Sequence, residues 1–507
     1  MDFIIKKLGW ENAAKLHKSA ANIYKDFIAG KKQAIVVSAM REPEFNTTDK
    51  LILLWEELKK EKIDKELVLK IILKIKDFHL KLLNQDLLCS KEKLIELVEK
   101  LFEEFKENIL FFIKEKELNK NILNPTKKND YSIELQNKQK LSIIGFWEKI
   151  SAKIISWVVD SMSLYWVCSK SVDLWNIVSQ KEIKNKTKKE VFDMLAEKIS
   201  DIILEKTKWW NIAILSGYIW SFPEGIEERI WRWYSDATAA ISAVGLARRG
   251  LEVAIEIQKS VRWVLSADPR VLDNPESAQV IKKLSYLTAR EITGDTGAQA
   301  KLLHPQALRS EVQEAGIKIH LFDPFSEEDG TWIVDEYIEK HKKCSWINFI
   351  WWRKNVIFFS ISSGKMFEKW ILAKLFNIVK KYFSVDIVSA SETEISFTID
   401  GNKKSEKKLK EMIKEIKKEF ILPDYSKSEF IEYKKNKALL FCVGEHMKNY
   451  IWLMAKVVNI LWKNNINLEV VSQGRLQRAI IFWIEEKDLN KAINLLHNEF
   501  IVWKNII

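Results

Sequence analysis

The 507-residue sequence predicts an α/β protein in which a mainly parallel sheet, covered by helices, precedes two smaller α+β modules. Three observations predict this class. Short apolar runs alternate with helical patterns as far as about residue 337, which is typical of βα units. From Leu51 to about Asn119 the pattern is almost purely helical, with Leu and Ile at helical spacing among Lys and Glu. After a polar connector at about residues 338–350, one order of strands and helices occurs twice.

The first region contains the elements of a parallel sheet. Ile35 to Ser38 and Ile212 to Leu215 are short apolar runs that predict buried strands. Ala237 to Arg249 predicts a helix, and the turn before it is of the kind that binds phosphate. We expect one catalytic domain over residues 1–337, with the helical insertion at about residues 51–135.

The second region predicts two copies of a βαββαβ module, at residues 351–424 and 436–507. In the first copy we expect strands at 355–361, 385–389 and 394–399 and helices at 370–382 and 405–420. In the second we expect strands at 438–443, 468–472 and 479–484 and helices at 451–463 and 489–500. One module of such a pair can be inserted in the other, so Phe500 to Trp503 is a candidate strand that returns to the first module.

The charge pattern argues against nucleic-acid or membrane binding. The formal net charge is +12, from 82 Lys and Arg against 70 Asp and Glu, and a basic excess can serve either kind of partner. Here, however, the lysines alternate with glutamates along helical faces, as between Lys403 and Glu419. The four cysteines lie far apart, so neither a disulfide framework nor a zinc site is expected. No signal peptide or long apolar run is evident, so a cytoplasmic protein is expected.

Tryptophan is unusually frequent, with 21 Trp against 15 Gly. Several tryptophans occupy turns between strand and helix, as in Ile230-Trp231-Arg232-Trp233-Tyr234-Ser235-Asp236. A phosphate at such a turn needs bare backbone N–H groups, which glycine provides. Our hypothesis is that UGA codons, which some bacterial lineages read as glycine, were translated as Trp in this sequence. The alternative is a naturally Trp-rich protein with a damaged site.

Two segments carry positively charged side chains suited to binding anions. Lys6-Lys7-Leu8-Gly9-Trp10-Glu11-Asn12 places a lysine beside a glycine turn after the first strand. Phosphoryl transfer depends on positioning and on charge stabilisation, which such a lysine supplies. In the turn at 231–236, the planar guanidinium of Arg232 suits a carboxylate, which it can bind through two hydrogen bonds.

These segments occur in one order with Val36-Val37-Ser38-Ala39-Met40, Thr47-Thr48-Asp49, Gly145-Phe146-Trp147-Glu148-Lys149-Ile150-Ser151-Ala152 and Ser216-Gly217-Tyr218-Ile219-Trp220. In this order the chain resembles the aspartate kinases, whose motifs are K-F-G-G-T-S, V-V-S-A-M, G-E-x-x-S, G-F-I-G and G-R-G-G-S-D. The resemblance covers nearly the whole chain. It implies an amino acid kinase fold, an αβα sandwich, followed by two ferredoxin-like ACT modules, with a helix start near Gly145.

The resemblance also implies site residues. The implied catalytic residues are Lys7, which neutralises charge on the transferred group, and Asp236, which organises Lys7. The implied ligands of the substrate are Ser38, Thr48, Glu148, Tyr218, Arg232 and Ser235. The implied nucleotide-binding residues are Lys7, Gly9, Trp10, Arg270 of Ala267-Asp268-Pro269-Arg270, and Lys301 of Lys301-Leu302-Leu303-His304-Pro305. The implied effector site comprises Met366, Leu372, Ser384, Val385 and Asp386, and no protein metal site is implied.

Each of these residues also has an ordinary structural interpretation. Thr48 or Asp49 can cap a helix, Glu148 can be a surface residue in a first helical turn, and Asp386 can cap a hairpin. Two segments also depart from the family. Glu11-Asn12 stand where the family has Thr-Ser, and Gln258-Lys259-Ser260 stand where it has W-T-D.

The implied activity is ATP-dependent phosphorylation of the β-carboxylate of L-aspartate, with ATP and Mg²⁺ required. That carboxylate is ionised at neutral pH, so no general base is needed. The implied partners are a lysine or threonine effector and a second copy in a homodimer or tetramer. One alternative is another amino acid kinase, acting on glutamate or acetylglutamate. The other is a catalytically silent regulator that binds amino acids.

Overall fold

The computed structural model describes residues 2–42, 44–60, 62–86, 91–120, 131–162, 168–174, 177–183, 185–219, 234–259, 264–293, 303–335, 347–362, 370–391, 394–401, 406–420, 431–445, 447–474 and 478–502. The chain divides into two compact units. The first comprises Met1–Trp263 and Gln306–Asp335, and the second comprises Val264–Pro305 and Glu336–Ile507.

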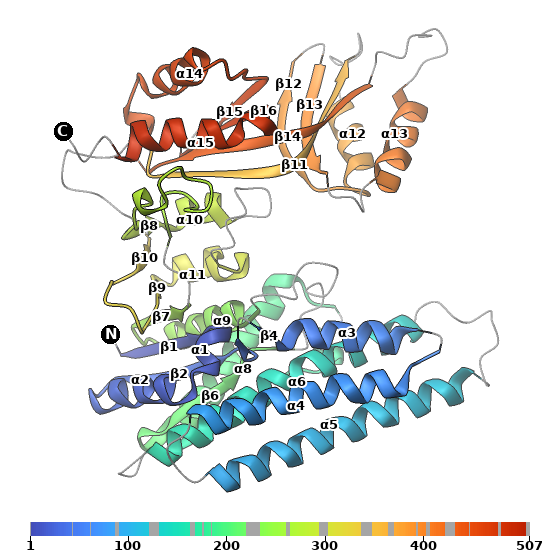
Figure 1. Ribbon diagram of the computed structural model, residues 1–507, viewed down its shortest axis with the longest axis vertical. Coiled ribbons are helices and arrows are strands. Elements are labelled where there is room, and N and C mark those ends of the chain that lie inside the picture. The colour runs from blue at the N-terminus through green and yellow to red at the C-terminus, as the bar shows by residue number, and fades with distance from the viewer. Residues whose placement is uncertain are drawn as a thin grey trace. The chain divides into compact units, whose positions relative to one another are not determined.

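The first unit is built on the expected parallel sheet (Figure 1). Its strands lie in the order β5 (Ser169–Val172), β6 (Ile212–Ser216), β2 (Lys32–Val37), β1 (Phe3–Leu8), β7 (Val253–Gln258), β9 (Lys318–Phe322) and β10 (Thr331–Val334). All neighbours in this order run parallel except β10, which is antiparallel to β9. Every residue of β1 is buried, as expected for a parallel strand covered on both faces.

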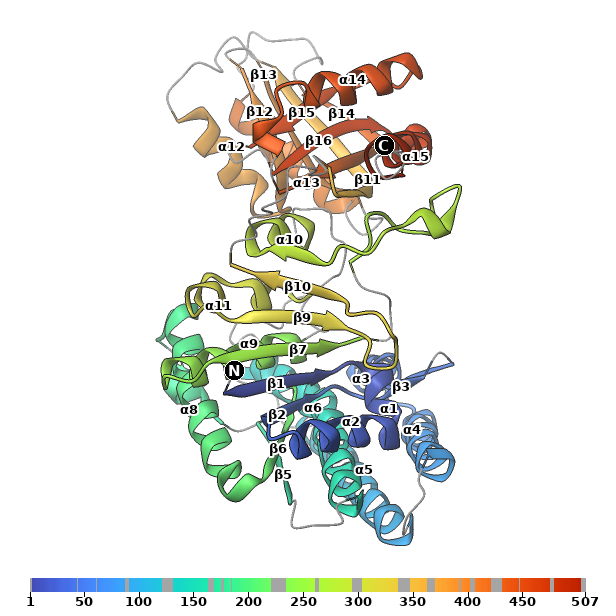
Figure 2. The same ribbon diagram turned by 90° about the vertical axis from the view of Figure 1, so that its left-hand side faces the viewer.

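Helices cover both faces of this sheet (Figure 2). One side carries α1 (Trp10–Ala14), α2 (Leu16–Ile28), α3 (Thr47–Lys59), α4 (Lys65–Asp86), α5 (Lys91–Lys120) and α6 (Tyr131–Met162), and the two-residue strands β3 (Arg41–Glu42) and β4 (Phe45–Asn46) precede α3. Apolar side chains of α2 to α6 and of β1, β2 and β6 share one core. Helices α3 to α6 thus form a stack of long helices on this side of the sheet. The bounds of the expected helical insertion stay a prediction.

Helix α6 corrects one expectation from the sequence. A helix start was expected near Gly145, but α6 runs without a break from Tyr131 to Met162. Its buried residues Ile143, Trp147, Ile150 and Ile154 recur every three or four positions, so a single apolar stripe continues through Gly145. The Trp147 ring lies 5.4 Å from His79 and 5.0 Å from Phe102 between ring centroids, within the core of the helical side.

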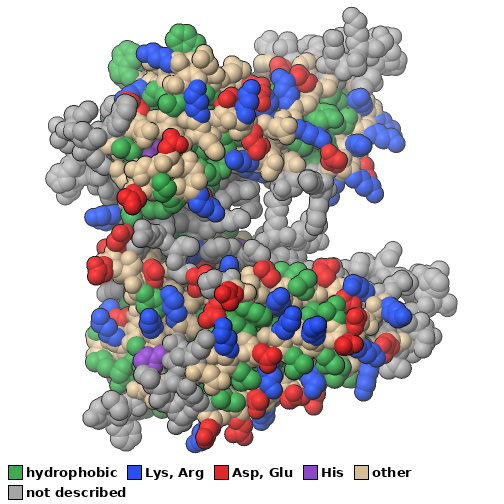
Figure 3. All heavy atoms as spheres, viewed as in Figure 1, with side chains coloured by type: hydrophobic (Ala, Val, Ile, Leu, Met, Phe, Trp, Pro, Cys, Tyr) green, Lys and Arg blue, Asp and Glu red, His purple; other side chains and the backbone are tan. Residues whose placement is uncertain are grey.

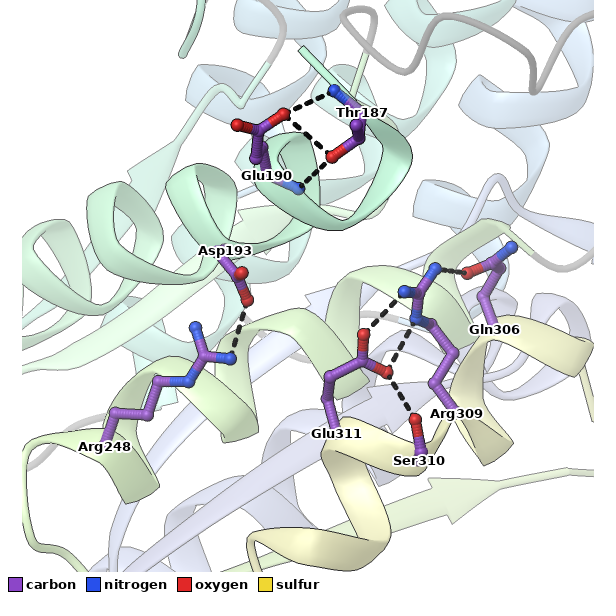
Figure 4. Close-up of polar contacts among 8 residues, drawn as sticks. All are labelled: Thr187, Glu190, Asp193, Arg248, Gln306, Arg309, Ser310 and Glu311. Atoms are coloured by element: carbon purple, nitrogen blue, oxygen red, sulfur yellow. Dashed lines mark hydrogen bonds and ion pairs between the residues drawn. The ribbon is translucent and has the colours of Figure 1, made fainter.

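The other side of the sheet carries α8 (Lys188–Lys206) and α9 (Tyr234–Arg248), with α11 (Ser310–Glu314) nearby. The short helix α7 (Gln180–Ile183) is linked to α8 by an ion pair between Glu182 and Lys198. Thr187 and Glu190 form a capping box at the start of α8 (Figure 4). Arg248 at the end of α9 donates to Asp193 of α8 at 2.6 Å. At Gly245 a Cβ would lie 2.0 Å from the Ala196 carbonyl oxygen, so only glycine lets α8 and α9 approach so closely.

The bidentate pair of Arg309 and Glu311 lies beside these helices (Figure 4). The Arg309 guanidinium also rests 4.8 Å from the centroid of the Phe192 ring in α8. The hydrogen bonds from Arg309 lower the pKa of Glu311 to about 2, so this carboxylate stays charged in the folded protein. These contacts stabilise the packing around α8 and α9. The N-terminal end of α9 carries Ser235 and Asp236.

The second unit contains β8 (Lys283–Ser285), α10 (Tyr286–Thr293) and one six-stranded antiparallel sheet. The order in that sheet is β12 (Val385–Ala390), β13 (Glu394–Asp400), β11 (Phe349–Ser362), β14 (Ile431–Val443), β16 (Ala479–Glu485) and β15 (Val470–Gln473). Its helices are α12 (Ile371–Val379), α13 (Glu406–Phe420), α14 (Leu453–Lys463) and α15 (Leu489–His497). The predicted repeat of strand and helix order is thus present.

The two repeats interlock through their long strands. The second half of β11 pairs with β13 from Val356 to Ser362, whereas its first half, from Phe349 to Arg353, pairs with the part of β14 that also binds β16. The first repeat is therefore inserted between strand segments that belong to the second. Residues 498–502 form a π-helical turn, so the candidate strand at Phe500 to Trp503 is wrong over the described part.

Short helical turns complete the described elements: η2 (Lys208–Trp210), η3 (Pro275–Ser277), η4 (Pro305–Leu308), η7 (Met447–Asn449) and η8 (Glu486–Asp488). Within the described ranges, no helix is both long enough and apolar enough to span a membrane. Figure 3 shows Lys and Arg side chains mixed with Asp and Glu over α4 and α5, the pattern that the sequence predicts for a solvated helical surface.

Two tryptophans adopt a backbone conformation that favours glycine. Of the described residues, five that are not glycine have positive φ: three are Asn, and the others are Trp209 at 60° and Trp370 at 75°. The left-handed region costs an L-residue with a large side chain about 1–2 kcal/mol. Both indoles are exposed, at 90% and 77% of their surface, so packing does not offset this cost. The backbone at these two positions agrees with the hypothesis that glycine occupies them.

Candidate active site

Four parallel strands of the first unit end side by side. In the register of the sheet, Ser216 of β6 lies opposite Val37 of β2, Val37 opposite Leu8 of β1, and Leu8 opposite Gln258 of β7. The residues that follow these strands are Gly217, Ser38, Gly9 and Lys259. In α/β sheets ligands bind at this carboxyl edge, because the loops that leave it surround a common crevice.

Two lysines share one carboxylate at this edge. Lys7 of β1 places Nζ 3.0 Å from Oδ1 of Asp236 at the start of α9, and both side chains are buried. Lys259 places its Nζ 4.0 Å from the other oxygen, Oδ2, of Asp236. Burial lowers the pKa of Lys259 to about 7; the Asp236 charge opposes this change, and the Lys7 charge adds to it. The three side chains thus form a compact cluster with more positive than negative charge.

Glu148 of α6 faces the same edge from the helical side. The Glu148 carboxyl accepts a hydrogen bond from the Ala39 backbone, and its Oε2 atom is buried without a hydrogen-bond partner in the described chain. Burial raises the pKa of Glu148 to about 8, although the charge of Lys7 and the Ala39 N–H oppose this change. The continuous helix α6, and not a helix start, therefore delivers this side chain.

Gly217 allows these groups to converge. A Cβ on Gly217 would lie 2.6 Å from the Ser235 Cβ, 2.8 Å from the Val37 carbonyl oxygen and 3.0 Å from Oε2 of Glu148. The first two contacts are too short to occur, so any larger residue would push α9 away from the end of β2. The Gly217 N–H donates to the Val37 carbonyl at 3.0 Å, which fixes the turn.

Hydroxyl groups complete the edge. The Ser38 and Ser235 hydroxyls are hydrogen-bonded to each other with oxygens 2.7 Å apart, and both side chains are buried. Thr238, one turn into α9, donates to the Gly217 carbonyl. Burial raises the pKa of Tyr218, and the nearby Glu148 charge adds to this effect, so the phenol stays protonated.

Thr48 lies at the start of α3, and its surroundings correct one structural alternative. The cap of α3 is Asn46, whose side-chain oxygen accepts from the N–H groups of Thr48 and Asp49. The Thr47 hydroxyl donates to the Met40 carbonyl at 2.8 Å. Neither Thr48 nor Asp49 is the cap residue considered from the sequence; Asn46 takes the position because its side chain reaches both orphan N–H groups.

Several predicted residues are not brought into this cluster. Arg232, Lys301 and Met366 lie outside the described residues, and only the backbone of Trp10 is described, at the start of α1. Arg270 belongs to the second unit, where its exposed guanidinium binds both carboxylate oxygens of Asp268, with distances of 2.5 to 3.0 Å. Their roles in nucleotide, substrate or effector binding remain predictions.

The predicted effector residues gather around the first repeat. Leu372 is partly exposed near the start of α12, and Ser384 and Val385 lead into β12. Asp386 is buried and forms an ion pair with Arg353 of β11, with Nη1 and Oδ2 2.6 Å apart. Arg353 was not predicted from the sequence, and its position in a buried strand gave no signal of a partner 33 residues away.

Among the described residues, no group of three or more His, Cys, Asp or Glu is arranged to hold a metal ion. The described carboxylates of this edge, Asp236 and Glu148, face a lysine and a backbone N–H. Two lysines and the glycine turn at Gly9 face this edge, and their positive charge suits an anion. Sequence reasoning treated Lys259 only as a departure from a family motif; its signal was a lysine directly after the strand that pairs with β1.

Comparisons with known proteins agree with this geometry. A family model for the ACT domain matches residues 440–500. An aspartate kinase of Gibberella moniliformis is 25% identical over 398 residues, which cover 73% of this chain and 72% of that protein. The aspartokinase of Schizosaccharomyces pombe is 23% identical over 386 residues, covering 71% and 68%.

Solved structures share the whole fold. The structure of Escherichia coli aspartokinase III in complex with aspartate and ADP matches with a TM-score of 0.67 at 16% identity, covering 98% of this chain and 99% of that one. The Clostridium acetobutylicum aspartate kinase gives a TM-score of 0.67 at 21% identity, covering 98% and 100%. At these identities the likeness establishes the fold.

Proposed function

The chain belongs to the aspartate kinase family, and we propose that it transfers the γ-phosphoryl group of ATP to the β-carboxylate of L-aspartate, giving 4-phospho-L-aspartate. The observation that carries this proposal is the buried pair of Lys7 and Asp236 at the carboxyl edge of the sheet. Relatives with this activity in their names support it, and so does the order of motifs along the chain.

The described groups suit two anions held face to face. Lys7 would stabilise negative charge on the transferred phosphoryl group, and Asp236 would keep the Lys7 ammonium in place. Glu148, once ionised, would bind the α-ammonium group of aspartate. Ser38, Thr48, Tyr218 and Ser235 would contact the substrate, and Arg232 its α-carboxylate. Gly9, Trp10, Arg270 and Lys301 would contact the nucleotide.

The reaction needs alignment and charge stabilisation rather than a base. A β-carboxylate oxygen forms a bond to the γ-phosphorus while the bond from that phosphorus to the β,γ-bridging oxygen breaks, and ADP leaves with the electron pair. The attacking carboxylate is already ionised at neutral pH, so no proton is removed. Mg²⁺ would enter with ATP as part of the nucleotide substrate, held by phosphate oxygens and water.

Regulation would act through the second unit. Its interlocked sheet carries two ACT-type repeats, and we propose that lysine or threonine binds there and inhibits the enzyme. A homodimer or tetramer would transmit the effect between subunits. The product would enter lysine, threonine and methionine biosynthesis, in the cytoplasm.

The experiment is ADP release by the purified full-length chain with MgATP and a panel of amino acids. L-aspartate is expected to give turnover well above glutamate and acetylglutamate. Preference for glutamate or acetylglutamate would assign a different amino acid kinase activity. Effector binding with no ADP release from any amino acid would instead support a silent regulator and overturn the proposal.

A further inference from the structure

Lys259 is the charged residue at this edge that the proposed mechanism does not use. It follows β7 directly, next to Gln258, whose carbonyl accepts a hydrogen bond from the Gly9 N–H at 2.9 Å. A Cβ on Gly9 would lie 2.5 Å from that carbonyl oxygen and 3.5 Å from the Lys259 Cα. The Lys259 backbone is therefore packed against the glycine turn that would receive the phosphates.

The electrostatics of this position favour an anion. Asp236 carries one negative charge between two ammonium groups, at 3.0 Å from Lys7 and 4.0 Å from Lys259, and the formal charge of the three side chains is +1. Only 12% of the Lys259 side chain is exposed, so water screens this charge weakly. A phosphate at this position would therefore be attracted by both ammonium groups.

Neighbouring polar groups also favour an anionic ligand at this position. The amide groups of Asn12 and Gln258 are fully buried, and within the described chain neither their nitrogen nor their oxygen atoms have a hydrogen-bond partner. Buried polar groups are normally paired, because an unpaired one costs about 1–3 kcal/mol. Asn12 lies in α1, directly after the Gly9 turn, and Gln258 ends β7 beside it. Phosphate oxygens would accept hydrogen bonds from both side-chain nitrogens.

We infer that Lys259 is a second phosphate-binding lysine, which contacts the ATP phosphates beside Lys7 while Asp236 holds the two ammonium groups in register. This inference rests on the proposed function for the identity of the anion. It assigns a function to a residue of this chain that stands where aspartate kinases have the threonine of W-T-D.

Proton linkage distinguishes this role from a structural one. In the free protein the pKa of Lys259 is about 7, set by burial and by the charges of Asp236 on α9 and Lys7 on β1. At pH 8 Lys259 is therefore mostly neutral, and a phosphate beside it would restore its charge. Binding of MgADP at pH 8 is then accompanied by uptake of close to one proton.

The test is calorimetry of MgADP binding to the full-length chain at pH 8, in two buffers with different ionisation enthalpies. The wild type is expected to take up a proton, whereas Lys259→Met loses this uptake and binds about 10- to 100-fold more weakly. Lys259→Arg, whose charge is permanent, is expected to bind tightly without proton uptake. Lys189→Met, which changes an exposed lysine of α8, is the matched control and should behave as the wild type.

Each outcome decides the inference. Unchanged affinity and proton uptake in Lys259→Met would overturn it, as would a wild type that does not bind MgADP. If Lys259→Met fails to fold, Lys259→Arg decides, because uptake that persists with arginine must come from another group, such as Glu148. Lys259-dependent uptake in a chain that does not phosphorylate aspartate would refute the proposed function and leave this inference standing. Aspartate phosphorylation by the wild type, together with unchanged affinity and proton uptake in Lys259→Met, would support the proposed function and refute this inference.

Discussion

Two ammonium groups approach the carboxylate of Asp236: Lys7 lies close to one of its oxygens and Lys259 to the other. Its place at the N-terminal end of α9 adds the partial positive charge of the helix. A fully buried aspartate in such surroundings fixes the position of each ammonium group. At the residue scale, this one side chain determines how the phosphate-binding lysines are arranged.

Replacement of Asp236 by Asn should therefore impair turnover while keeping the shape of the side chain. We expect kcat for aspartate-dependent ADP release to fall on the order of 10²-fold, because both lysines lose the charge that orients them. Asp193→Asn, which removes the partner of Arg248 on the surface between α8 and α9, is the control and should leave kcat unchanged. A full kcat in Asp236→Asn, in protein shown by circular dichroism to be folded, would contradict this role.

Glu148 predicts a pH dependence of substrate binding. Its pKa of about 8 leaves it mostly protonated at pH 6.5 and mostly ionised at pH 8.5. Only the ionised form attracts the α-ammonium group of aspartate, so KM for aspartate should fall roughly tenfold over this range. Glu148→Gln should have a high KM that does not follow this profile. An identical pH profile in both proteins would show that Glu148 does not bind the substrate.

The raised pKa of Glu148 also makes the free energy of unfolding depend on pH. Because its pKa is raised above the ordinary value of 4.5, its favourable contribution is complete below that pH and is lost as the pH rises through about 8. Glu148→Gln is therefore expected to lose less stability than the wild type between pH 6 and pH 9. The free energy of unfolding measured in urea at both pH values checks this expectation.

The sequence was sufficient to predict a mainly parallel sheet but not which side chains meet at its carboxyl edge. Lys7, Ser38 and Asp236 follow from motifs at strand and helix ends, and the register of parallel strands brings such ends together. The hydrogen bond between Ser38 and Ser235 and the approach of Lys259 to Asp236 depend on packing between α9 and the sheet. No local pattern contains that information, since the partners are separated by many elements.

At the scale of elements, apolar periodicity predicted most helices and strands, and tertiary packing decided the remainder. The stripe through Trp147 extends α6 beyond the expected helix start, because a buried aromatic cluster stabilises the continuation. The inserted repeat depends on one long strand, β11, that serves two repeats with different halves. The polar residues Arg353 to Asn355 interrupt its apolar pattern where the register shifts, and the sequence predicts a strand only from residue 355.

The two tryptophans with positive φ give a prediction about stability. Trp370→Gly and Trp209→Gly should each raise the free energy of unfolding by about 1 kcal/mol, because glycine relieves the left-handed strain and the exposed indoles pack little. Trp147→Gly, in contrast, should destabilise by about 3–5 kcal/mol, because it empties a buried site in a helix. Chemical denaturation of the three variants measures these changes. Destabilisation by all three would show that the indoles at 209 and 370 belong to the fold.

At the scale of the whole molecule, the second unit should unfold as one body although it contains two repeats. Phe359→Ala empties a fully buried site in the core of the first repeat and should cost about 3–5 kcal/mol. Since β11 and β14 run through both repeats, we expect hydrogen exchange to accelerate in β16 as well as in β13. Trp462→Ala, at an exposed position of α14, is the control. Faster exchange confined to β12 and β13 would show that the repeats unfold independently.

The central claim is that phosphoryl transfer takes place at the carboxyl edge beside Lys7. The most direct measurement is trapping of the acyl phosphate with hydroxylamine, which converts 4-phospho-L-aspartate to aspartyl hydroxamate, in the wild type and in two adjacent lysine variants. Lys7→Met should lower the rate on the order of 10²- to 10³-fold. In the wild type the buried ammonium group of Lys6 pairs with Asp26 and not with Asp236. Lys6→Met should therefore keep the rate in the folded fraction. Hydroxamate formed at the wild-type rate by Lys7→Met would contradict the claim.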